Sequence, residues 1–224
     1  MSDLFPERIE TERLVLEAAT TETLDPLELY EHVREGAPHI DEITEYVTWD
    51  PHETPRETEE FLELVTEERE NGEGATYAIR PKPGEDGEAR SASEDSSGDQ
   101  REPRDGAGEF AGFTGMSVDW DLQTATFGAW LRKPFWGHGY SGERAAAFME
   151  VAFDRLDLDA VVVTVHEGNE KSRKAVSRYI EAHGGRREGL LRNLEINMDG
   201  TVANVHRFTV TRAEYREATG DGAD

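Results

Sequence analysis

Three glycines, Gly137, Gly139 and Gly142, fall within six residues of the stretch GHGYSG, between an apolar run and a helical pattern. A glycine loop at the start of a helix presents free main-chain N–H groups, and the helix dipole favours an anion beside them. Because glycine has no side chain, a large anionic group can approach the backbone closely. The spacing therefore predicts a phosphate-binding loop, with a plain turn at the start of a helix as the alternative.

Two known phosphate-binding patterns can be compared with this loop. The Walker pattern needs Gly-Lys followed by Ser or Thr, which the loop lacks. The dinucleotide pattern GxGxxG matches literally, but the strand before the loop looks antiparallel and no parallel strand–helix–strand unit follows an N-terminal strand. We therefore do not expect a dinucleotide site.

The elements next to the loop are predicted by periodic patterns. After the loop, apolar residues recur at the spacing of one stripe on an amphipathic helix, namely Ala145, Phe148, Met149, Ala152, Phe153 and Leu156. Residues 160–165 are uniformly apolar and predict a strand that is buried on both faces. Asn169 can then cap a helix. That helix would bury Ala175, Val176, Tyr179 and Ile180.

The remaining patterns predict a mixed α/β domain around a central sheet. Further strands are expected at 12–18, 75–79, 109–120 and 124–131, the last two antiparallel and joined around Asp121. Helices are expected at 26–34 and 40–46, and a third should begin at Thr54-Pro55. Asp199-Gly200 between alternating runs predicts a hairpin near the end of the chain.

One segment, from Pro81 to Gly108, contains no aromatic residue and no aliphatic residue larger than alanine. Such a composition cannot bury enough apolar surface to offset the entropy of ordering. We expect a disordered acidic insertion within a single domain that spans 1–218, rather than a linker between domains, since neither flank looks self-sufficient. Residues 219–224 are expected to form a flexible tail.

The chain is strongly acidic: Lys plus Arg number 24 and Asp plus Glu 49, which gives a net charge of −25. The acids are spread along the whole sequence, which favours adaptation to a cytoplasm rich in salt, as in an extreme halophile. An ordinary acidic protein, or one with a cationic partner, is the alternative. Such a surface repels nucleic acid.

Composition also restricts the kinds of site and location. The chain has no cysteine, which excludes disulfides, thiolate metal sites and a cysteine nucleophile. No run approaches the roughly 20 apolar residues of a membrane span. The charged start lacks the apolar stretch of a signal peptide. We therefore expect a cytoplasmic protein with no membrane partner, and no His/Asp/Glu spacing suggests a metal.

Several motifs occur in an order that resembles a known family. They are Glu12-Arg13-Leu14, Trp49-Asp50-Pro51-His52, WLRKPFWGHGYSGE, VVVTV, Asn169 with Ser172, and Glu188-Gly189 with Arg192. In this order they resemble the GNAT acetyltransferases, and specifically their ribosomal-protein N-terminal (RimJ/RimL-like) branch. The resemblance covers nearly the whole chain except the segment from Pro81 to Gly108.

The resemblance implies a GNAT fold, with a mostly antiparallel twisted sheet of about six to seven strands flanked by helices on both faces. It implies acetyl-CoA as the donor, with its pyrophosphate on the loop amides of Gly137, His138, Gly139, Tyr140, Ser141 and Gly142. The pantetheine arm would pair with the strand that ends at Trp130 and Leu131. Asn169 would contact this arm. Ser172 would lie near the sulfur as general acid, although a serine there can also merely satisfy backbone donors.

The sequence departs from the family pattern in two places. Ser141 replaces the usual Gly or Ala, which should still permit close approach of the donor. The stretch after Ser172 is about one turn longer than usual and ends at Gly184-Gly185 without the usual aromatic residue. This difference affects the wall on the acceptor side.

The acceptor is expected to be a primary amine that attacks the thioester directly. At neutral pH, deprotonating an α-amine costs about 1 kcal/mol and a lysine about 4–5 kcal/mol, because their pKa values are about 7.7–8.0 and about 10.4. An N-terminal amine therefore needs only a weak base. The candidates for that base are His52, Glu45, Glu195 and His206. Glu195 should face solvent if its two neighbours face inward.

Three functions are compatible with these features. The first is an acetyl-CoA-dependent N-acetyltransferase that acts on the α-amine of a protein or peptide, for example a ribosomal protein. The second keeps the donor but acetylates a small amine, such as a polyamine or an aminoglycoside-like compound. The third is a coenzyme A binding module without turnover. The oligomeric state is expected to be a monomer or a homodimer.

Overall fold

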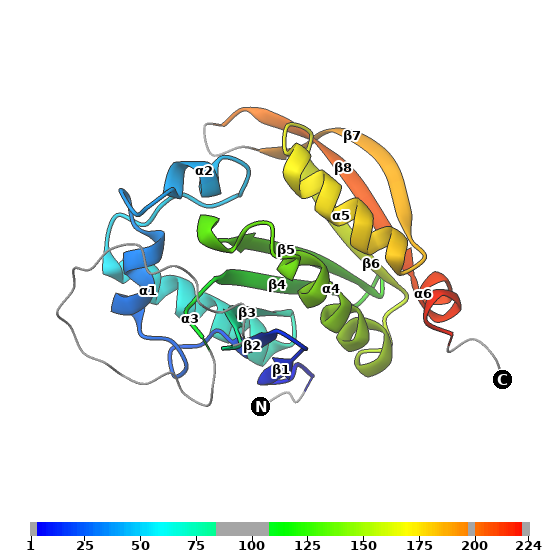
Figure 1. Ribbon diagram of the computed structural model, residues 1–224, viewed down its shortest axis with the longest axis horizontal. Coiled ribbons are helices and arrows are strands. Elements are labelled where there is room, and N and C mark those ends of the chain that lie inside the picture. Colours follow the sequence, from blue (N-terminus) through cyan, green and yellow to red (C-terminus); the bar gives the residue numbers. More distant parts are fainter. Residues whose placement is uncertain (1–3, 84–107, 197–199, 221–224) are drawn as a thin grey trace.

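The computed structural model of the chain describes residues 4–83, 108–196 and 200–220 (Figure 1). Most of the expected insertion at 81–108, Asp199 of the expected hairpin turn and the end of the tail from 221 lie outside the described residues. The two described ends of the insertion are joined, because the amide of Gly108 donates a hydrogen bond of 2.9 Å to the carbonyl of Pro81. No helix in the described ranges is long and apolar enough to cross a membrane.

A single twisted sheet forms the centre of the described structure. Its eight strands lie in the order β1-β2-β3-β4-β5-β6-β8-β7, and every neighbouring pair is antiparallel except β5 and β6. The strands are β1 (Arg8–Glu10), β2 (Leu14–Ala18), β3 (Gly74–Pro81), β4 (Gly112–Asp119), β5 (Thr124–Leu131), β6 (Ala160–His166), β7 (Arg186–Ile196) and β8 (Val202–Thr211). The expected mostly antiparallel sheet is confirmed, with one strand more than the upper estimate.

Helices cover both faces of the sheet, as expected. They are α1 (Pro26–Val33), α2 (Ile40–Thr44), α3 (Pro55–Asn71), α4 (Tyr140–Glu150), α5 (Glu170–Ala182) and α6 (Arg212–Thr219). Figure 1 shows α4 and α5 lying across the same face. There they enclose a core that includes Tyr77 and Phe148. A second core, which includes Leu62 of α3 and Phe113 of β4, fills the other face.

The two helices that flank the site begin and pack largely as their sequences predict. All six residues of the apolar stripe that starts at Ala145 are buried, and the stripe runs past the end of α4 into a π-helical turn, η3 (Val151–Arg155). Asn169 caps α5, because its Oδ1 accepts a hydrogen bond of 2.9 Å from the amide of Ser172. Of the apolar residues expected to be buried on α5, Ala175 is only half-buried.

The strand before the glycine loop differs from the expectation in one respect. β5 is antiparallel to β4, but it also pairs with β6 in parallel, so β5, α4 and β6 form a parallel strand–helix–strand unit that was not predicted. The pairing of β5 with β6 covers three residue pairs and ends at Thr126 and Val162. Both strands continue beyond this point, and β6 stays paired with β8. The sheet therefore opens between β5 and β6.

Candidate active site

The glycine loop leads from β5 through the short 3-10 turn η2 (Lys133–Phe135) to the start of α4. Gly137 and Gly139 have φ values of 83° and 80°, a left-handed conformation that glycine adopts without steric cost. Gly139 is the N-cap of α4, and no side chain caps the helix. A helix start of this kind leaves its first N–H groups without intrahelical partners.

The main-chain N–H groups of the loop are largely available. Within the described residues, no hydrogen bond uses the amides of the five residues from Gly137 to Ser141. The amide of Gly142 donates to the carbonyl of Gly139 at 3.1 Å, so five of the six loop amides from Gly137 to Gly142 are available. The sixth is engaged because α4 has already begun, and its first turn closes on the N-cap carbonyl. A Cβ atom placed on Gly137 would have no heavy atom within 4 Å, so the space above the loop is open.

Trp136 ties the loop to the elements on either side. Its indole Nε1 donates a hydrogen bond of 2.7 Å to the carbonyl of Leu131, at the end of β5. The ammonium group of Lys171, in the first turn of α5, lies 5.0 Å from the centre of the indole ring. Consequently the carbonyl of Leu131 is already engaged, and the loop is held beside the start of α5.

The opening between β5 and β6 exposes main-chain groups along the edge of β5. The amide of Arg132 donates to Ala111, next to β4, at 2.8 Å. Since main-chain groups alternate from side to side along a strand, those of Ala129 face away from β4, toward the opening. An extended ligand could therefore pair with this edge of β5.

A cavity of about 590 Å³ adjoins the opening. Its floor on β4 and β5 combines small residues, among them Gly115, Thr126 and Gly128, with the aromatic rings of Phe113 and Trp130. Its walls come from α1, from the segment after α2, from α3, from β6, from the start of α5 and from β7. They include Tyr46, Trp49, His52, Phe61, Glu68, Thr164, His166, Asn169, Ser172 and Glu195. The structure thus brings Trp130, Asn169 and Ser172 together, whereas the glycine loop and Leu131 do not line this cavity.

Glu195 shows the clearest departure from the sequence prediction. The sequence predicts that it faces solvent, with Leu194 and Ile196 inward, but those two side chains are 53% and 69% exposed. Instead Glu195 lines the cavity, and its Oε1 accepts a hydrogen bond of 2.9 Å from the Thr164 hydroxyl on β6. The pairing with β8 explains the difference: Glu195 lies opposite buried Ala203, whereas Ile196 lies opposite exposed Val202. The polar residue is therefore on the inward face and its apolar neighbours are on the exposed one.

His52 also lines the cavity, in a mainly aromatic setting. Its Nδ1 lies 2.8 Å from the hydroxyl of buried Thr58, and its ring packs near Trp49 and Phe61. Burial lowers the pKa of His52 below its ordinary value, because a charged imidazolium is poorly solvated there. The ring is therefore neutral at neutral pH. Its main-chain N–H and C=O are both bonded, to Val33 and Glu35.

The two other base candidates lie outside the cavity. Glu45 is exposed at the end of α2, where its hydrogen bond to the Tyr46 hydroxyl raises the pKa of that tyrosine. His206 is buried on β8 between two arginines, with its ring nitrogens 3.5 Å from Arg173 Nη1 and 3.3 Å from Arg187 Nη1. Burial, with these two cations, lowers the pKa of His206. Neither residue is placed to receive a proton from a molecule in the cavity.

The family is decided by comparison with known proteins. The profile of the acetyltransferase (GNAT) domain matches residues 13–179, most of the chain. The chain is a GNAT acetyltransferase. No curated protein matches its sequence.

Solved structures share the fold of this GNAT acetyltransferase at low sequence identity. One is the microcin C7 self-immunity acetyltransferase MccE in complex with acetyl-CoA and AMP, with a TM-score of 0.71 and 17% identity over 94% of this chain and 99% of that one. Another is a GCN5-related N-acetyltransferase from Brucella melitensis, with a TM-score of 0.69 and 18% identity over 96% of this chain and 85% of that one. A third is the ribosomal α-N-protein acetyltransferase RimL in complex with coenzyme A, with a TM-score of 0.69 and 18% identity over 92% of this chain and 98% of that one.

The GNAT family uses acetyl-CoA, and the structure of this acetyltransferase fits such a donor. Five free amides at a helix start suit a diphosphate, and the open edge of β5 suits an extended amide-containing arm. Among the described residues, no group of three or more His, Asp or Glu side chains could hold a metal ion.

Several cavity residues of the acetyltransferase were not predicted. Thr164 is the one polar residue in an otherwise apolar run, residues 160–165, and a single hydroxyl in such a strand indicates a residue that faces a polar site. His166, at the end of β6, packs 5.1 Å from the ring of Tyr46. Glu68 gave no signal, because one glutamate among many on an acidic helix is not distinctive. Burial raises the pKa of Glu68 above its ordinary value.

Proposed function

We propose that this acetyltransferase moves the acetyl group of acetyl-CoA to a primary amine, the N-terminal α-amine of a protein or peptide. One observation carries the proposal: the sheet opens between β5 and β6, with unpaired loop amides near its end and a cavity that contains a carboxylate and a hydroxyl beside it. Donor and acceptor could meet at such an opening.

The donor would be held mainly by main-chain groups. The amides from Gly137 to Ser141 would bind the diphosphate, and the edge of β5 at Ala129 would pair with the pantetheine arm. Asn169, whose Oδ1 is engaged with the amide of Ser172, could still donate from its amide nitrogen. When bound, acetyl-CoA supplies an acyl group that is already activated as a thioester. The protein therefore has mainly to orient the two reactants.

Glu195 is the base that the geometry favours. It lines the cavity, and the hydrogen bond from Thr164 fixes its carboxylate. It would accept the proton of the attacking amine, directly or through water. His52 is the second candidate. It is neutral, but one ring nitrogen is engaged with Thr58.

Ser172 would supply the proton that the departing thiolate needs. The residue lies in the first turn of α5 and lines the same cavity, while its amide is engaged by the Asn169 cap. The cap fixes the backbone at Ser172 without using its hydroxyl. Asn169 therefore provides the helix cap, and the hydroxyl of Ser172 would act as the proton donor.

An α-amine fits this set of groups better than a lysine side chain. Freeing a lysine of its proton at neutral pH costs about 3–4 kcal/mol more, because its pKa is about three units higher. A single carboxylate held by a threonine is a weak base, which is enough for an α-amine. A small polyamine is the second candidate acceptor, because Glu68 and Glu195 place two acidic side chains in one cavity.

An acetylation assay in molar KCl tests the proposal. Short peptides with free Ala or Ser N-termini, the same peptides with blocked N-termini, and spermidine would be compared by the release of free coenzyme A. We expect saturable release with the free peptides and none with the blocked ones. Activity on spermidine alone would favour the small-amine function. Binding of coenzyme A without turnover on any amine would identify a binding module.

A further inference from the structure

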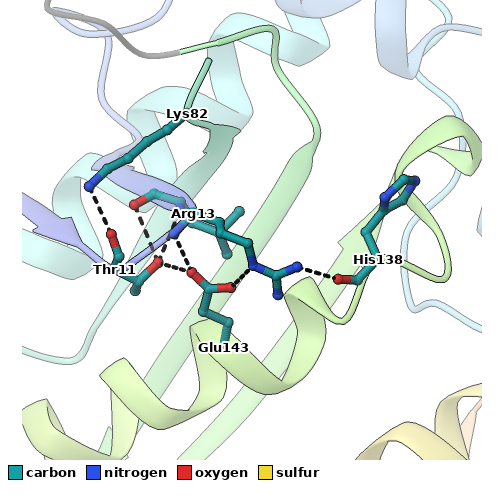
Figure 2. A network of polar contacts seen from close by, with 6 residues as sticks. Thr11, Arg13, Lys82, His138 and Glu143 are labelled. Atoms are coloured by element: carbon teal, nitrogen blue, oxygen red, sulfur yellow. Dashed lines mark hydrogen bonds and ion pairs between the residues drawn. The ribbon is translucent and has the colours of Figure 1, made fainter. Parts of the chain in front are cut away.

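We propose that Arg13 locks the direction of the peptide group between His138 and Gly139, and so holds the glycine loop in the form that binds a diphosphate. The proposal rests on the donor site described above. Arg13 belongs to the link between β1 and β2, far from the loop in sequence, yet Figure 2 shows its guanidinium between Glu143 and His138.

Arg13 contacts the loop and the start of α4 through three donors. Its main-chain N–H donates to Glu143 Oε1 at 2.6 Å, and its Nε donates to Oε2 at 2.7 Å. Its Nη1 donates to the carbonyl oxygen of His138 at 2.9 Å. One side chain thus bridges a carboxylate on α4 and a carbonyl in the loop, which requires the forked geometry of a guanidinium.

The carboxylate of Glu143 is the fixed point of this arrangement. The Thr11 hydroxyl donates a further hydrogen bond to Oε1 at 2.5 Å (Figure 2). Burial alone would raise the pKa of Glu143, but the hydrogen bonds from Thr11 and Arg13 lower it below its usual value. Glu143 therefore stays ionised with both oxygens engaged. Arg13 balances its charge, which would otherwise oppose an anion at the start of α4.

Holding the carbonyl of His138 also sets the direction of the next N–H group. All described peptide bonds are trans. In a planar trans peptide the C=O and the N–H point in opposite directions. While Nη1 holds the oxygen of His138, the N–H of Gly139 must point away from Arg13. Without this contact the peptide could rotate more easily, because one of its two flanking torsions belongs to Gly139, and glycine permits many backbone conformations.

The surroundings of Arg13 suit a role in positioning rather than in stability. The side chain of Arg13 is 49% exposed and that of Glu143 is 14% exposed. If the guanidinium is removed, Glu143 keeps its hydrogen bonds from the Thr11 hydroxyl and from the main-chain N–H of residue 13, so its carboxylate is not left without partners. The guanidinium carbon lies 5.3 Å from the centre of the Tyr140 ring, and Nη2 would be 3.4 Å from a Cβ on Gly139. Arg13 therefore flanks the N-cap of α4 closely. Loss of the lock should weaken donor binding more than it weakens folding.

The test compares Arg13→Met with Arg56→Met in molar KCl. Arg56 pairs with Glu60 at 2.8 Å on the exposed side of α3, so both variants remove one positive charge and one ion pair. The Kd for coenzyme A would be measured by calorimetry. The kcat and KM would be measured with acetyl-CoA and with S-acetylpantetheine, which lacks the diphosphate.

We expect Arg13→Met to raise the Kd for coenzyme A and the KM for acetyl-CoA at least about tenfold. Its kcat/KM with S-acetylpantetheine and its melting temperature should stay near those of the wild-type chain, and Arg56→Met should change none of these values. Arg13→Lys should behave like Arg13→Met, because one ammonium group cannot bridge Glu143 and the His138 carbonyl in the same way.

Three results would overturn the lock: wild-type affinity in Arg13→Met, equal losses with both donors, or full recovery in Arg13→Lys. The first would show that the contact of Arg13 with the His138 carbonyl does not affect donor binding. The second would show a general defect, and the third would show that charge alone suffices. In each case the wild-type chain would still bind coenzyme A. Failure of the wild-type chain to bind it would overturn the donor site, and this inference with it.

Discussion

The carboxylate of Glu195 on β7 accepts a hydrogen bond of 2.9 Å from the hydroxyl of Thr164 on β6, although β8 lies between these strands in the sheet. The bond therefore spans β8 and holds the carboxylate at the cavity. A side chain from the outermost strand thereby reaches the opening next to β5. In the proposed function, this contact delivers the base to the place where the acceptor amine would lie.

Replacing Glu195 with Gln should lower kcat on the order of 100-fold, because a general base commonly contributes at least this much. The KM for acetyl-CoA should change little, since the donor is held by main-chain groups elsewhere. Glu188→Gln is the control, because Glu188 lies on the same strand and its carboxylate pairs with Arg186 on the surface. Steady-state kinetics with a free-amine peptide measure the effect. Equal rates in the two variants would exclude Glu195 and leave His52 as the base.

Ser172→Ala should lower turnover by roughly tenfold, at the low end for a general acid, because a thiolate is a good leaving group. The affinity for coenzyme A should be nearly unchanged. The amide of residue 172 would still donate to Asn169, so α5 should keep its cap. Calorimetry and single-turnover kinetics separate the two quantities. A variant that turns over like the wild type would leave Ser172 with no chemical role.

Gly139→Glu should abolish binding of coenzyme A. The substitution puts a side chain on a left-handed residue, which costs roughly 1–2 kcal/mol, and adds a negative charge where the diphosphate should sit. Gly220→Glu is the control, because Gly220 has a similar φ of 82° but lies at the end of α6, away from the glycine loop. Both variants should lose some stability, and only Gly139→Glu should lose affinity. Undiminished binding would refute the loop as the diphosphate site.

The free energy of unfolding should decrease as the pH is lowered from about 6.5 to about 4, because of His32. Burial, aided by Arg132, lowers the pKa of His32 from 6.5 to about 4, and its ring stacks on Phe110 at 5.5 Å. Between these two pH values the imidazole of His32 binds a proton in the unfolded chain but stays largely unprotonated in the folded chain. The contribution is therefore complete above about pH 6.5 and lost as the pH falls to about 4.

His32→Gln removes this titration. Urea unfolding in molar KCl at a series of pH values should show a shallower decline in the free energy of unfolding for the variant than for the wild type. The difference should be confined to the range from about pH 6.5 to about pH 4. Parallel declines in the two proteins would show that His32 titrates normally in the folded state.

Removing residues 84–107 and joining the ends by a short glycine linker should leave the fold and the donor affinity intact. The ends already meet, since Gly108 bonds to Pro81 at 2.9 Å, and a shorter loop costs less entropy to close. Lys82 should be kept, because its ammonium donates to the carbonyl of Thr11 at 2.8 Å and pairs with Glu10 at 3.0 Å. A melting temperature well below that of the full chain would show that the segment is structural.

Much of the fold could be predicted from the sequence because local patterns determine its main elements. The stripe that begins at Ala145 has the helical period, and Asn169 is a typical N-cap. The glycine loop also follows from residue types alone. The sequence patterns do not predict two short elements, β1 and α6. The second has a recognisable capping box, in which Thr211 and Glu214 exchange hydrogen bonds.

The remaining parts of the site depend on contacts that no local pattern encodes. Glu195 faces inward because it lies opposite buried Ala203, whereas the apolar character of Leu194 and Ile196 indicates the opposite face. The parallel pairing of β5 with β6 joins residues separated by α4. Arg13 and Glu143 meet only because β2 runs beneath α4, so their motifs could be recognised in the sequence but not connected.

Main-chain recognition has a consequence for how such a chain can evolve. Peptide nitrogens are present whatever side chains surround them, so the loop from Gly137 to Ser141 needs no lysine or arginine of its own to attract a polyanion. Substitutions elsewhere could accumulate until acids outnumber bases by 49 to 24 without eroding it. Arg13, which lies behind the loop and pairs with Glu143, is one cation that would have to be retained during such substitutions.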